Sequence, residues 1–262
     1  MNTPHLSDGA DALAALKARI ATHHATSALP FVTLCYAQGL DGSIANANGT
    51  PMQISCRDAA VQTHAMRAVH DAILVGVGTV LSDNPRLTTR LVDGPSPRPV
   101  VLDSRLRTPA DARLITSAAS TPCIASTDAG CEDAAYRLEQ AGAAVVRFPA
   151  TPDAHVHLPA LLAHLGSIGV RAVMVEGGSR VIASFLRERL VHAVVVTVSM
   201  CFLAGKTVLS GQAAAAPEER GTRLFPGIEP QHLFWVGRDL VIQGAPHWRE
   251  EPGEPHGPSA AR

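Results

Sequence analysis

Short apolar runs alternate with helical patterns along most of this chain, and this alternation limits the possible folds more than any other feature. Such runs predict seven strands, at Phe31–Tyr36, Ala72–Val75, Pro99–Asp103, Thr121–Ala125, Ala144–Phe148, Ala172–Val175 and Ala193–Val198. Helical patterns between them predict helices at Cys56–His70, Glu132–Ala141, Leu158–Ile168 and Ser179–Leu190. Strands joined by helical crossovers pair in parallel. We therefore expect an α/β fold in which helices flank a mostly parallel central sheet.

The helix predicted from Cys56 carries a capping pattern at its start. Ser55 is followed three residues later by Asp58, and in such a pattern a side-chain oxygen bonds free backbone amides of the first turn. We therefore expect Ser55 to cap this helix.

The two ends of the chain depart from the alternation. Leu13, Leu16 and Ile20 recur at helical spacing in an Ala-rich segment that stops by Pro30, which predicts a helix appended to the fold. The segment Gly244–Arg262 is rich in Pro, Gly and charge with little to bury, which predicts a disordered tail. We therefore divide the chain into a helical extension (1–29), one compact domain (30–244) and a tail (245–262).

Composition argues against several partners. Lys and Arg total 22 against 23 acidic residues, without a long run of either sign, so the chain lacks the electrostatic footprint of a nucleic-acid or membrane-surface binder. No apolar stretch approaches the ~20 residues that span a bilayer. Asp8 and Asp11 stand where a signal peptide would carry positive charge. We expect a cytoplasmic protein.

The cysteines and histidines do not predict a metal site. The five cysteines are odd in number and have no Cys-x-x-Cys spacing, which suits free thiols in a reducing compartment. His155 and His157 alternate, and a solvated loop pair is the better interpretation of them than a pair of ligands. We expect no bound metal.

Polar or Gly-rich segments follow four of the predicted strands, namely Ala37–Gly42, Gly76–Thr79, Ser104–Arg107 and Glu176–Arg180. In a parallel sheet, ligands collect outside the carboxyl ends of the strands, where helix N-termini point their amides outward. The four segments therefore predict one shared binding site.

Two of these segments suit phosphate. Gly76 and Gly78 let a ligand approach the backbone after a buried run, although a tight strand-to-helix turn is the alternative. Glu176–Ser179 places two glycines before a helix start, so a diphosphate can lie against backbone amides; the alternative is a turn that only lets the helix pack on the sheet. After Gly78, the chain continues with polar or charged side chains at Thr79, Asp83, Arg86 and Arg90.

The segment after the third strand favours NADPH over NADH. A lone acid there usually binds the ribose hydroxyls of NADH, whereas Ser104 and Arg105 suit a 2′-phosphate. The alternative is that Arg105 and Arg107 are ordinary surface residues and that Asp103 caps a turn.

Arginines at the same edge suit a phosphorylated substrate. Arg67 and Arg90 are the candidates, with Arg86 as a substitute. Asp41 is either a polar anchor for substrate or a simple turn aspartate. Because no nucleophile pattern or metal-binding histidine pair stands out, the binding loops favour hydride transfer, which needs mainly the alignment of two bound ligands.

These motifs together resemble the pyrimidine reductase family of riboflavin biosynthesis, which has a dihydrofolate-reductase-like fold. The resemblance runs from about Phe31 to Leu209 and is carried by Val32–Gly42, Ile54–Cys56, Asp71–Arg90, Arg98–Ser104 and Val175–Gly178. Since no zinc-deaminase motif precedes them, the resemblance implies a stand-alone reductase.

The resemblance implies NADPH-dependent reduction of a ribosylamino-pyrimidine 5′-phosphate to its ribitylamino form, by hydride transfer to the sugar C1′. It places substrate at Arg67, Leu87, Arg90 and Glu176, and it makes Asp41 and Glu176 the candidate catalytic residues, with Asp41 orienting the opened sugar or relaying a proton. The implied cofactor contacts, together with the neighbouring glycines, are Ala37, Gly76, Gly78, Thr79, Asp83, Ser104, Gly177, Gly178, Ser179, Arg180, Val181 and Ile182.

Two departures from the family leave the substrate open. Ser43 stands where Lys or Arg is common, and Gln53 stands where many bacterial members carry Trp. The alternatives are a reductase of a related heterocycle such as a pterin, and a nucleotide-binding protein without turnover. Family members are often dimers, and an exposed apolar strand near Val194–Met200 is the predicted contact of a homodimer.

Overall fold

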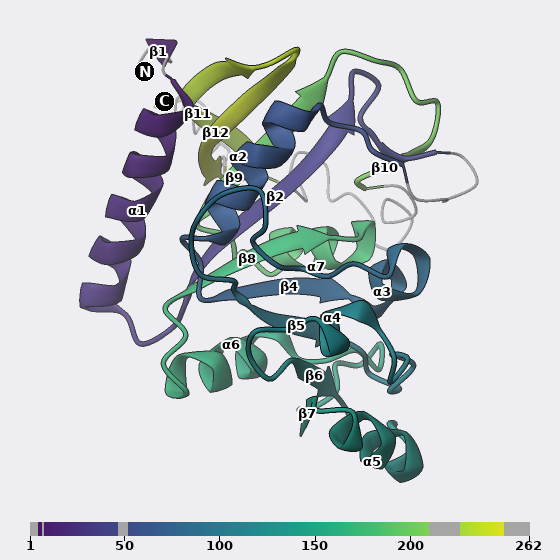
Figure 1. Ribbon diagram of the computed structural model, residues 1–262. Coiled ribbons are helices and arrows are strands. Elements are labelled where there is room, and N and C mark those ends of the chain that lie inside the picture. The colour runs from purple at the N-terminus through teal and green to yellow at the C-terminus, as the bar shows by residue number, and fades with distance from the viewer. Residues whose placement is uncertain (1–4, 7, 47–51, 210–225, 249–262) are drawn as a thin grey trace, which may run out of the picture.

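The computed structural model describes residues 5–6, 8–46, 52–209 and 226–248. They form a ten-stranded sheet with helices on both faces and a separate two-stranded sheet (Figure 1). The strands are β1 (His5–Leu6), β2 (Phe31–Gly39), β3 (Ser43–Ala45), β4 (Ala72–Gly76), β5 (Arg98–Leu102), β6 (Cys123–Ser126), β7 (Ala144–Arg147), β8 (Ala172–Gly177), β9 (Ala193–Ser199), β10 (Lys206–Thr207), β11 (Gly227–Val236) and β12 (Asp239–His247). The helices are α1 (Gly9–Thr26), α2 (Arg57–Arg67), α3 (Val77–Asp83), α4 (Arg113–Thr116), α5 (Glu132–Gln140), α6 (Leu158–Ser167) and α7 (Ser179–Arg187).

The strand order of the large sheet is β1-β11-β12-β9-β2-β8-β4-β5-β6-β7. All pairings from β9 to β7 are parallel, and only β12 pairs antiparallel with its neighbours β9 and β11. The predicted α/β class with a mostly parallel sheet flanked by helices is confirmed. Because β8 inserts between β2 and β4, the carboxyl ends of these three strands lie side by side.

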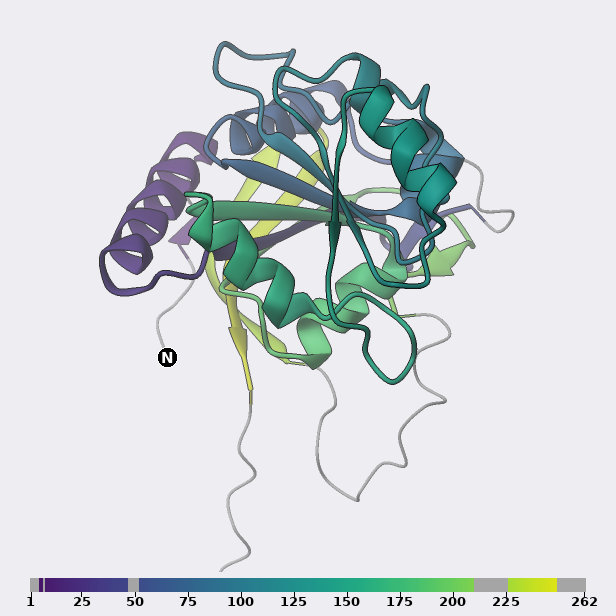
Figure 2. The ribbon, with the colours of Figure 1, turned by 90° about the horizontal axis from the view of Figure 1, so that it is seen from below.

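Each central strand buries both of its faces, which explains why the strands are apolar throughout. In β4, Leu74 packs with Phe185 and the other core residues of α6 and α7, whereas Ile73 and Val75 pack on the opposite face with core residues of α3 and α5. Figure 2 shows the resulting three layers, with α6 and α7 on one side of the sheet and α2 and α5 on the other.

All seven predicted strands and all five predicted helices are present, with ends shifted by a few residues. The β11–β12 hairpin, the short helices α3 and α4 and the short strands β1, β3 and β10 were not predicted. The hairpin pairs β12 with β9, so β9 is an interior strand and its residues Ala193–Thr197 are buried. We predicted that an exposed strand near Val194–Met200 mediates dimerisation. The strand is not exposed, so this part of the prediction is wrong.

The hairpin also corrects the predicted tail. Gly244–His247 belong to β12, where a Cβ at Gly244 would lie 2.2 Å from the carbonyl oxygen of Glu229. This close strand approach, rather than disorder, is the reason for the glycine. Residues 249–262 lie outside the described part of the chain.

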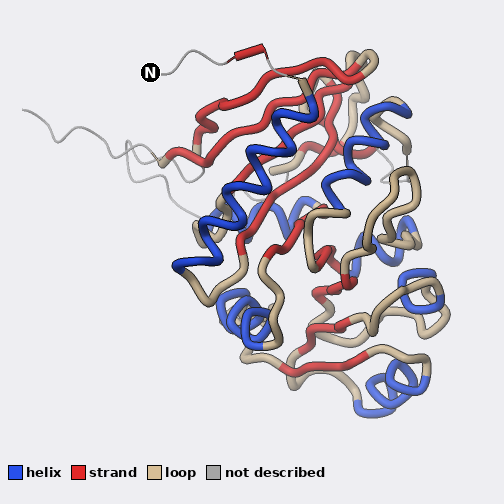
Figure 3. Tube along the Cα trace, turned by 60° about the vertical axis from the view of Figure 1, so that its left-hand side comes forward, coloured by secondary structure: helices blue, strands red, loops and turns tan. Residues whose placement is uncertain are grey.

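Helix α1 is confirmed and is an integral part of the core rather than an appendage. Ala12 and Leu16 are fully buried in a cluster with Phe31 of β2 and Phe234 of β11, and Figure 3 shows α1 lying against the strands. The buried amide of Gln243 donates to the carbonyl of Ala12 at 2.8 Å.

The predicted cap of α2 is wrong. The helix begins after Cys56 and has no side-chain cap; instead the buried carboxylate of Asp239 accepts the backbone N–H of Cys56 at 2.6 Å. A distant acceptor from the hairpin thus takes the place of the local one. No helix in the described ranges is long and apolar enough to cross a membrane.

Candidate active site

The carboxyl ends of β2, β8, β4 and β5 bring the four predicted loop segments to one edge of the sheet. The two Gly-rich segments lie directly beside each other, because a Cβ at Gly178 would lie 3.4 Å from Oγ1 of Thr79. Ser104 follows β5, the next strand along. The predicted convergence of these segments is therefore present.

Glu176 lies on a β-bulge at the centre of this edge. The register of β4 and β8 shifts there: Leu74 is opposite Val175, but Val75 is opposite Gly177. Bulges often re-aim a side chain next to an active site. Here the bulged residue sends its carboxylate to α2.

Arg67 of α2 binds Glu176 through two parallel hydrogen bonds. Nε donates to Oε1 at 2.7 Å and Nη2 to Oε2 at 2.6 Å, and Nη1 donates to the carbonyl of Thr88 at 3.1 Å. The side chains of Arg67 and Glu176 are only 12% and 15% exposed. Such a bidentate pair fixes both groups and neutralises both charges.

Arg90 is consequently the better candidate for a substrate phosphate. Its side chain is exposed, and within the described ranges its guanidinium has no hydrogen-bond partner. Desolvation and the neighbouring charges of Arg67, Arg86 and Arg113 lower the pKa of Arg90, although it stays a cation. Since Glu176 neutralises Arg67, the positive charge that favours an anionic ligand here comes from Arg90 with the neighbouring Arg86 and Arg113.

His64 belongs to the same cluster and was not predicted as a site residue. It is 3% exposed, and its Nδ1 accepts the backbone N–H of Arg90 at 3.0 Å. Burial lowers the pKa of His64 to about 4, and the charges of Arg67 and Arg90 add to the effect. The only sequence signal was its position three residues before Arg67 on α2, which places both on one helix face.

The Gly-rich segments combine a packing role with an open surface. A Cβ at Gly76 would lie 2.9 Å from Cγ2 of Val181, so this glycine lets α7 approach the sheet. At Gly78 a Cβ would meet nothing within 4 Å. Gly177 and Gly178 have φ of 117° and 44°, which favour glycine. The packing interpretation is therefore confirmed for Gly76, whereas ligand approach to the backbone at Gly78 stays a prediction.

Helices α3 and α7 both begin at this edge without a side-chain cap. Their first-turn amides carry partial positive charge and have no intrahelical partner. Two such N-termini beside the open Gly78 offer donors for a diphosphate.

Three predicted contact residues have their side chains in the core. Val181 and Ile182 are 9% and 1% exposed and pack on the sheet, so a ligand can meet only their backbone. Leu87 is 2% exposed and adopts a left-handed φ of 58° that turns it into the α3 side of the core. The outward positions of this set are Ser179, which is half-buried, and Arg180, which is exposed.

Asp41 is occupied by the turn that follows β2. Its carboxylate accepts the Ser43 N–H and hydroxyl and the backbone N–H groups of Leu203 and Ala204. Desolvation acts to raise the pKa of Asp41, but these hydrogen bonds outweigh it and hold the pKa below its usual value. The geometry favours the turn aspartate over the proton relay.

The two departures from the family differ in their surroundings. Ser43 is 2% exposed, and its hydroxyl accepts the Gly205 N–H at 2.9 Å while donating to Asp41, so it is a packed structural residue. Gln53 is exposed and lines a cavity of about 650 Å³ at the start of α2. Arg67 is the last residue of that helix, about 15 Å further along its axis.

The loop after β5 agrees partly with its prediction. Asp103 is 1% exposed and its Oδ2 accepts both the N–H and the hydroxyl of Thr108 at 2.7 Å, which is the turn-capping alternative. Arg105 and Arg107 are exposed on either side of the buried Leu106.

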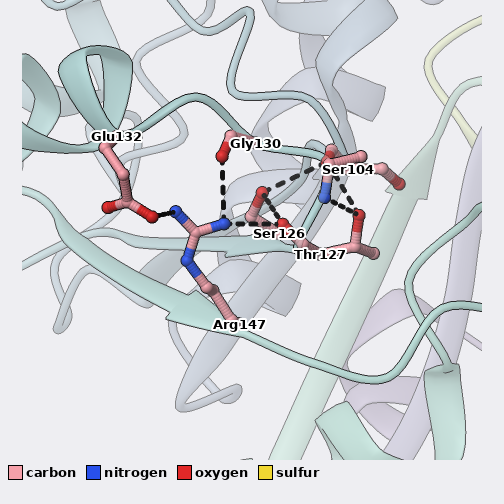
Figure 4. Close-up of polar contacts among 7 residues, drawn as sticks. Ser104, Ser126, Thr127, Gly130, Glu132 and Arg147 are labelled. Carbon is pink, nitrogen blue, oxygen red and sulfur yellow. Dashed lines mark hydrogen bonds and ion pairs between the residues drawn. The ribbon is translucent and has the colours of Figure 1, made fainter.

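Ser104 is held by the end of β6, the next strand of the sheet (Figure 4). Its carbonyl accepts the hydroxyls of Ser126 and Thr127 at 3.3 and 3.0 Å. Arg147, at the end of β7, donates through Nη1 to the carbonyls of Thr127 and Gly130 at 2.9 and 3.1 Å. The ends of β5, β6 and β7 thus form one braced cluster.

Comparison with known families matches residues 30–225 to the RibD C-terminal domain. This chain belongs to that family. The expected relationship to the pyrimidine reductases is therefore confirmed, and the RibD C-terminal domain includes every site segment described above.

Two reviewed relatives carry the same name, 2,5-diamino-6-ribosylamino-4(3H)-pyrimidinone 5′-phosphate reductase. The protein of Archaeoglobus fulgidus is 36% identical over 197 residues, which cover 70% of this chain and 88% of the relative. The protein of Methanothermobacter thermautotrophicus is 34% identical over 220 residues, covering 82% and 97%.

The fold is shared with a solved bifunctional relative. The crystal structure of a diaminohydroxyphosphoribosylaminopyrimidine deaminase/5-amino-6-(5-phosphoribosylamino)uracil reductase from Thermotoga maritima superposes with a TM-score of 0.69 at 25% identity. The match covers 87% of this chain and 60% of that one, so this RibD C-terminal domain spans about three fifths of the bifunctional protein.

Proposed function

We propose that this protein is a reductase of riboflavin biosynthesis, which converts a ribosylamino-pyrimidine 5′-phosphate to the ribitylamino-pyrimidine 5′-phosphate with NADPH. The observation that carries the proposal is the part-buried Arg67–Glu176 pair at the sheet edge where α3 and α7 begin without a side-chain cap. Arg67 also binds the Thr88 carbonyl, on the segment that carries the exposed Arg90. We infer an anion site at Arg90 and a diphosphate site at the two helix starts. The names and coverage of the two archaeal relatives support the same activity.

The residues at the strand ends fit NADPH. Uncapped amides at α3 and α7 and the open position at Gly78 suit its diphosphate. The braced Ser104 with the exposed Arg105 and Arg107 suits its 2′-phosphate. When bound, NADPH supplies the hydride that reduces the acceptor carbon.

The protein's own contribution is to hold the acceptor in place. Arg90 binds the substrate phosphate as a charge-assisted partner. Glu176, oriented by Arg67, accepts hydrogen bonds from the polar groups of the substrate through the lone pairs that Arg67 leaves open. Alignment of the sugar C1′ with the hydride donor is the main catalytic effect that such binding supplies.

Reduction of a pterin is the weaker alternative. The residues Ser43 and Gln53 favour it in the sequence, but Ser43 is packed into the Asp41 turn and Gln53 lies at the far end of α2 from Arg67. Binding of NADPH without turnover is the third possibility.

A steady-state assay separates these functions. NADPH oxidation is measured with the 2,5-diamino pyrimidinone substrate, its deaminated uracil counterpart and dihydrofolate side by side. The proposal expects turnover with at least one of the two pyrimidine phosphates and none with dihydrofolate. Turnover with dihydrofolate alone, or cofactor binding without any turnover, would overturn it.

We further propose a cytoplasmic homodimer. With β9 in the interior, the exposed apolar residues Leu40, Met200 and Phe202 beside the Asp41 turn are the better candidate contact; the N–H of Leu40 donates to the carbonyl of Cys201 there. Light scattering of the wild type and of Phe202→Glu tests this, with a dimer and a monomer as the expected results.

A further inference from the structure

We propose that His64 is a positioning residue, which fixes the backbone of the segment Thr88–Arg90 by accepting the N–H of Arg90. The inference rests on the proposed function, because it takes Arg90 as the ligand of the substrate phosphate. His64 itself touches neither ligand in this account.

One face of α2 holds both ends of the segment. His64 accepts the N–H of Arg90 at 3.0 Å, and Arg67, three residues later, donates to the carbonyl of Thr88 at 3.1 Å. A rigid helix therefore sets the position from which the Arg90 side chain leaves the loop. The chain just before, at Leu87, has a left-handed φ of 58°, so the segment does not follow from regular secondary structure and needs such external partners.

The same pairings link Arg90 to the centre of the site. Arg67 bonds Glu176 with its other two nitrogens, so His64, Arg67 and the β8 bulge form one rigid unit. The backbone from which the Arg90 side chain extends is thereby held in place relative to the carboxylate of Glu176. Positioning of this kind acts on substrate affinity rather than on the cofactor.

The imidazole must be neutral to do this. Nδ1 accepts the bond only when it carries no proton, and a charged ring would add a third cation beside Arg67 and Arg90. Burial and the two guanidinium groups hold the pKa of His64 to about 4, with Glu176 acting weakly in the other direction. At neutral pH the ring is therefore uncharged, and the bond from the Arg90 N–H selects the tautomer with the proton on Nε2.

Two substitutions distinguish the effect of the hydrogen-bond acceptor of His64 from the effect of the volume of its ring. In His64→Asn an amide oxygen takes the place of Nδ1, and in His64→Leu a similar volume carries no acceptor. We expect His64→Leu to raise the KM for the pyrimidine phosphate about five- to tenfold, with kcat and the KM for NADPH within about twofold. His64→Asn should stay within about twofold of the wild type on all three. If His64→Leu does not fold, His64→Ala takes its place with the same expected split.

Hydrogen exchange of the Arg90 amide tests the bond without any turnover. We expect this amide to be protected in the wild type and in His64→Asn, and to exchange at least about tenfold faster in His64→Leu. Equal protection in all three proteins would overturn the proposal, as would equal KM increases in the Asn and Leu variants. If the wild type reduces neither pyrimidine phosphate, the proposed function fails, and the exchange result still decides the role of His64.

Discussion

At the scale of single residues, the two arginines of the site differ in what they bind. Arg67 uses all three guanidinium nitrogens on Glu176 and Thr88, and it is largely buried. Arg90 is exposed, with a cationic surrounding and no hydrogen bond to its guanidinium from the described residues. The sequence alone does not show which of the two arginines is free to bind a phosphate. The difference arises from the bulge in β8, which directs the Glu176 carboxylate to Arg67.

Arg90→Ala should therefore weaken the substrate and not the cofactor. Loss of one charge-assisted contact, worth about 1.5–3 kcal/mol, predicts a KM for the pyrimidine phosphate about 10- to 150-fold higher and an unchanged Kd for NADPH. Arg86→Ala, which removes another exposed arginine of the same loop, is the control and should change the KM less than about threefold. Equal loss of both affinities would show that Arg90 does not bind the phosphate.

The two candidate catalytic carboxylates should separate in a second comparison. Asp41→Asn should lower the melting temperature but leave the pH profile of kcat unchanged, because the carboxylate only ties the turn to Leu203 and Ala204. Glu176→Gln should lower kcat/KM at least about tenfold, since it removes the charge that Arg67 orients. A changed pH profile in Asp41→Asn would restore its role as a proton relay.

At the scale of elements, the sequence predicts correctly the strands that are buried on both faces and the helices that follow them. Central parallel strands are apolar on both faces and therefore visible as runs, and the following helices begin where such runs stop. The β11–β12 hairpin was missed because β11 is mostly exposed or half-buried and contains Pro230, and β12 contains Gly244. Helix α3 has seven residues, too few for a helical period to be recognised. The His64 contact joins residues 26 positions apart, which no local pattern reveals.

The cluster at the ends of β5, β6 and β7 gives an element-scale prediction. Arg147→Met removes the bonds that hold Thr127 and Gly130, and with them the brace behind Ser104. We expect the KM for NADPH to rise about three- to tenfold while the KM for the pyrimidine phosphate stays constant. Glu132→Gln is the matched control and should have little effect, because Glu132 is 86% exposed. A rise in the KM for the pyrimidine phosphate instead would show that this cluster supports substrate binding and not NADPH binding.

At the scale of the whole molecule, two histidines with lowered pKa values connect the outer helices to the rest of the fold. His192 accepts the Val32 N–H through Nδ1 at 3.0 Å, stacks on Phe31 and gives its carbonyl to Arg19 of α1. Burial lowers the pKa of His192 to about 4, with the nearby His23 and Arg19 adding to the effect. His64 has a similarly lowered pKa and joins α2 to the Arg90 loop.

These histidines predict a stability that falls in mild acid. Their folded pKa of about 4 lies below the ordinary 6.5, so between these values the unfolded chain binds more protons than the folded one. The free energy of unfolding should thus be highest above pH 6.5 and fall as the pH drops toward 4, by at most about 1.4 kcal/mol per pH unit for each histidine and less for the half-buried His192.

Urea unfolding of the wild type and of the double variant His64→Asn/His192→Asn between pH 7.5 and 5 checks this prediction. The variant should show a clearly smaller slope of stability against pH. Parallel curves for the two proteins would show that neither histidine carries a lowered pKa in the fold.

The central claim is that this site aligns a nicotinamide hydride with the sugar C1′ of a pyrimidine phosphate. It is tested most directly with NADPH that carries deuterium at the transferable C4 position, followed by mass spectrometry and NMR of the product. The account predicts a ribitylamino-pyrimidine phosphate with one deuterium on C1′. A product without deuterium, or with deuterium on the pyrimidine ring, would contradict it.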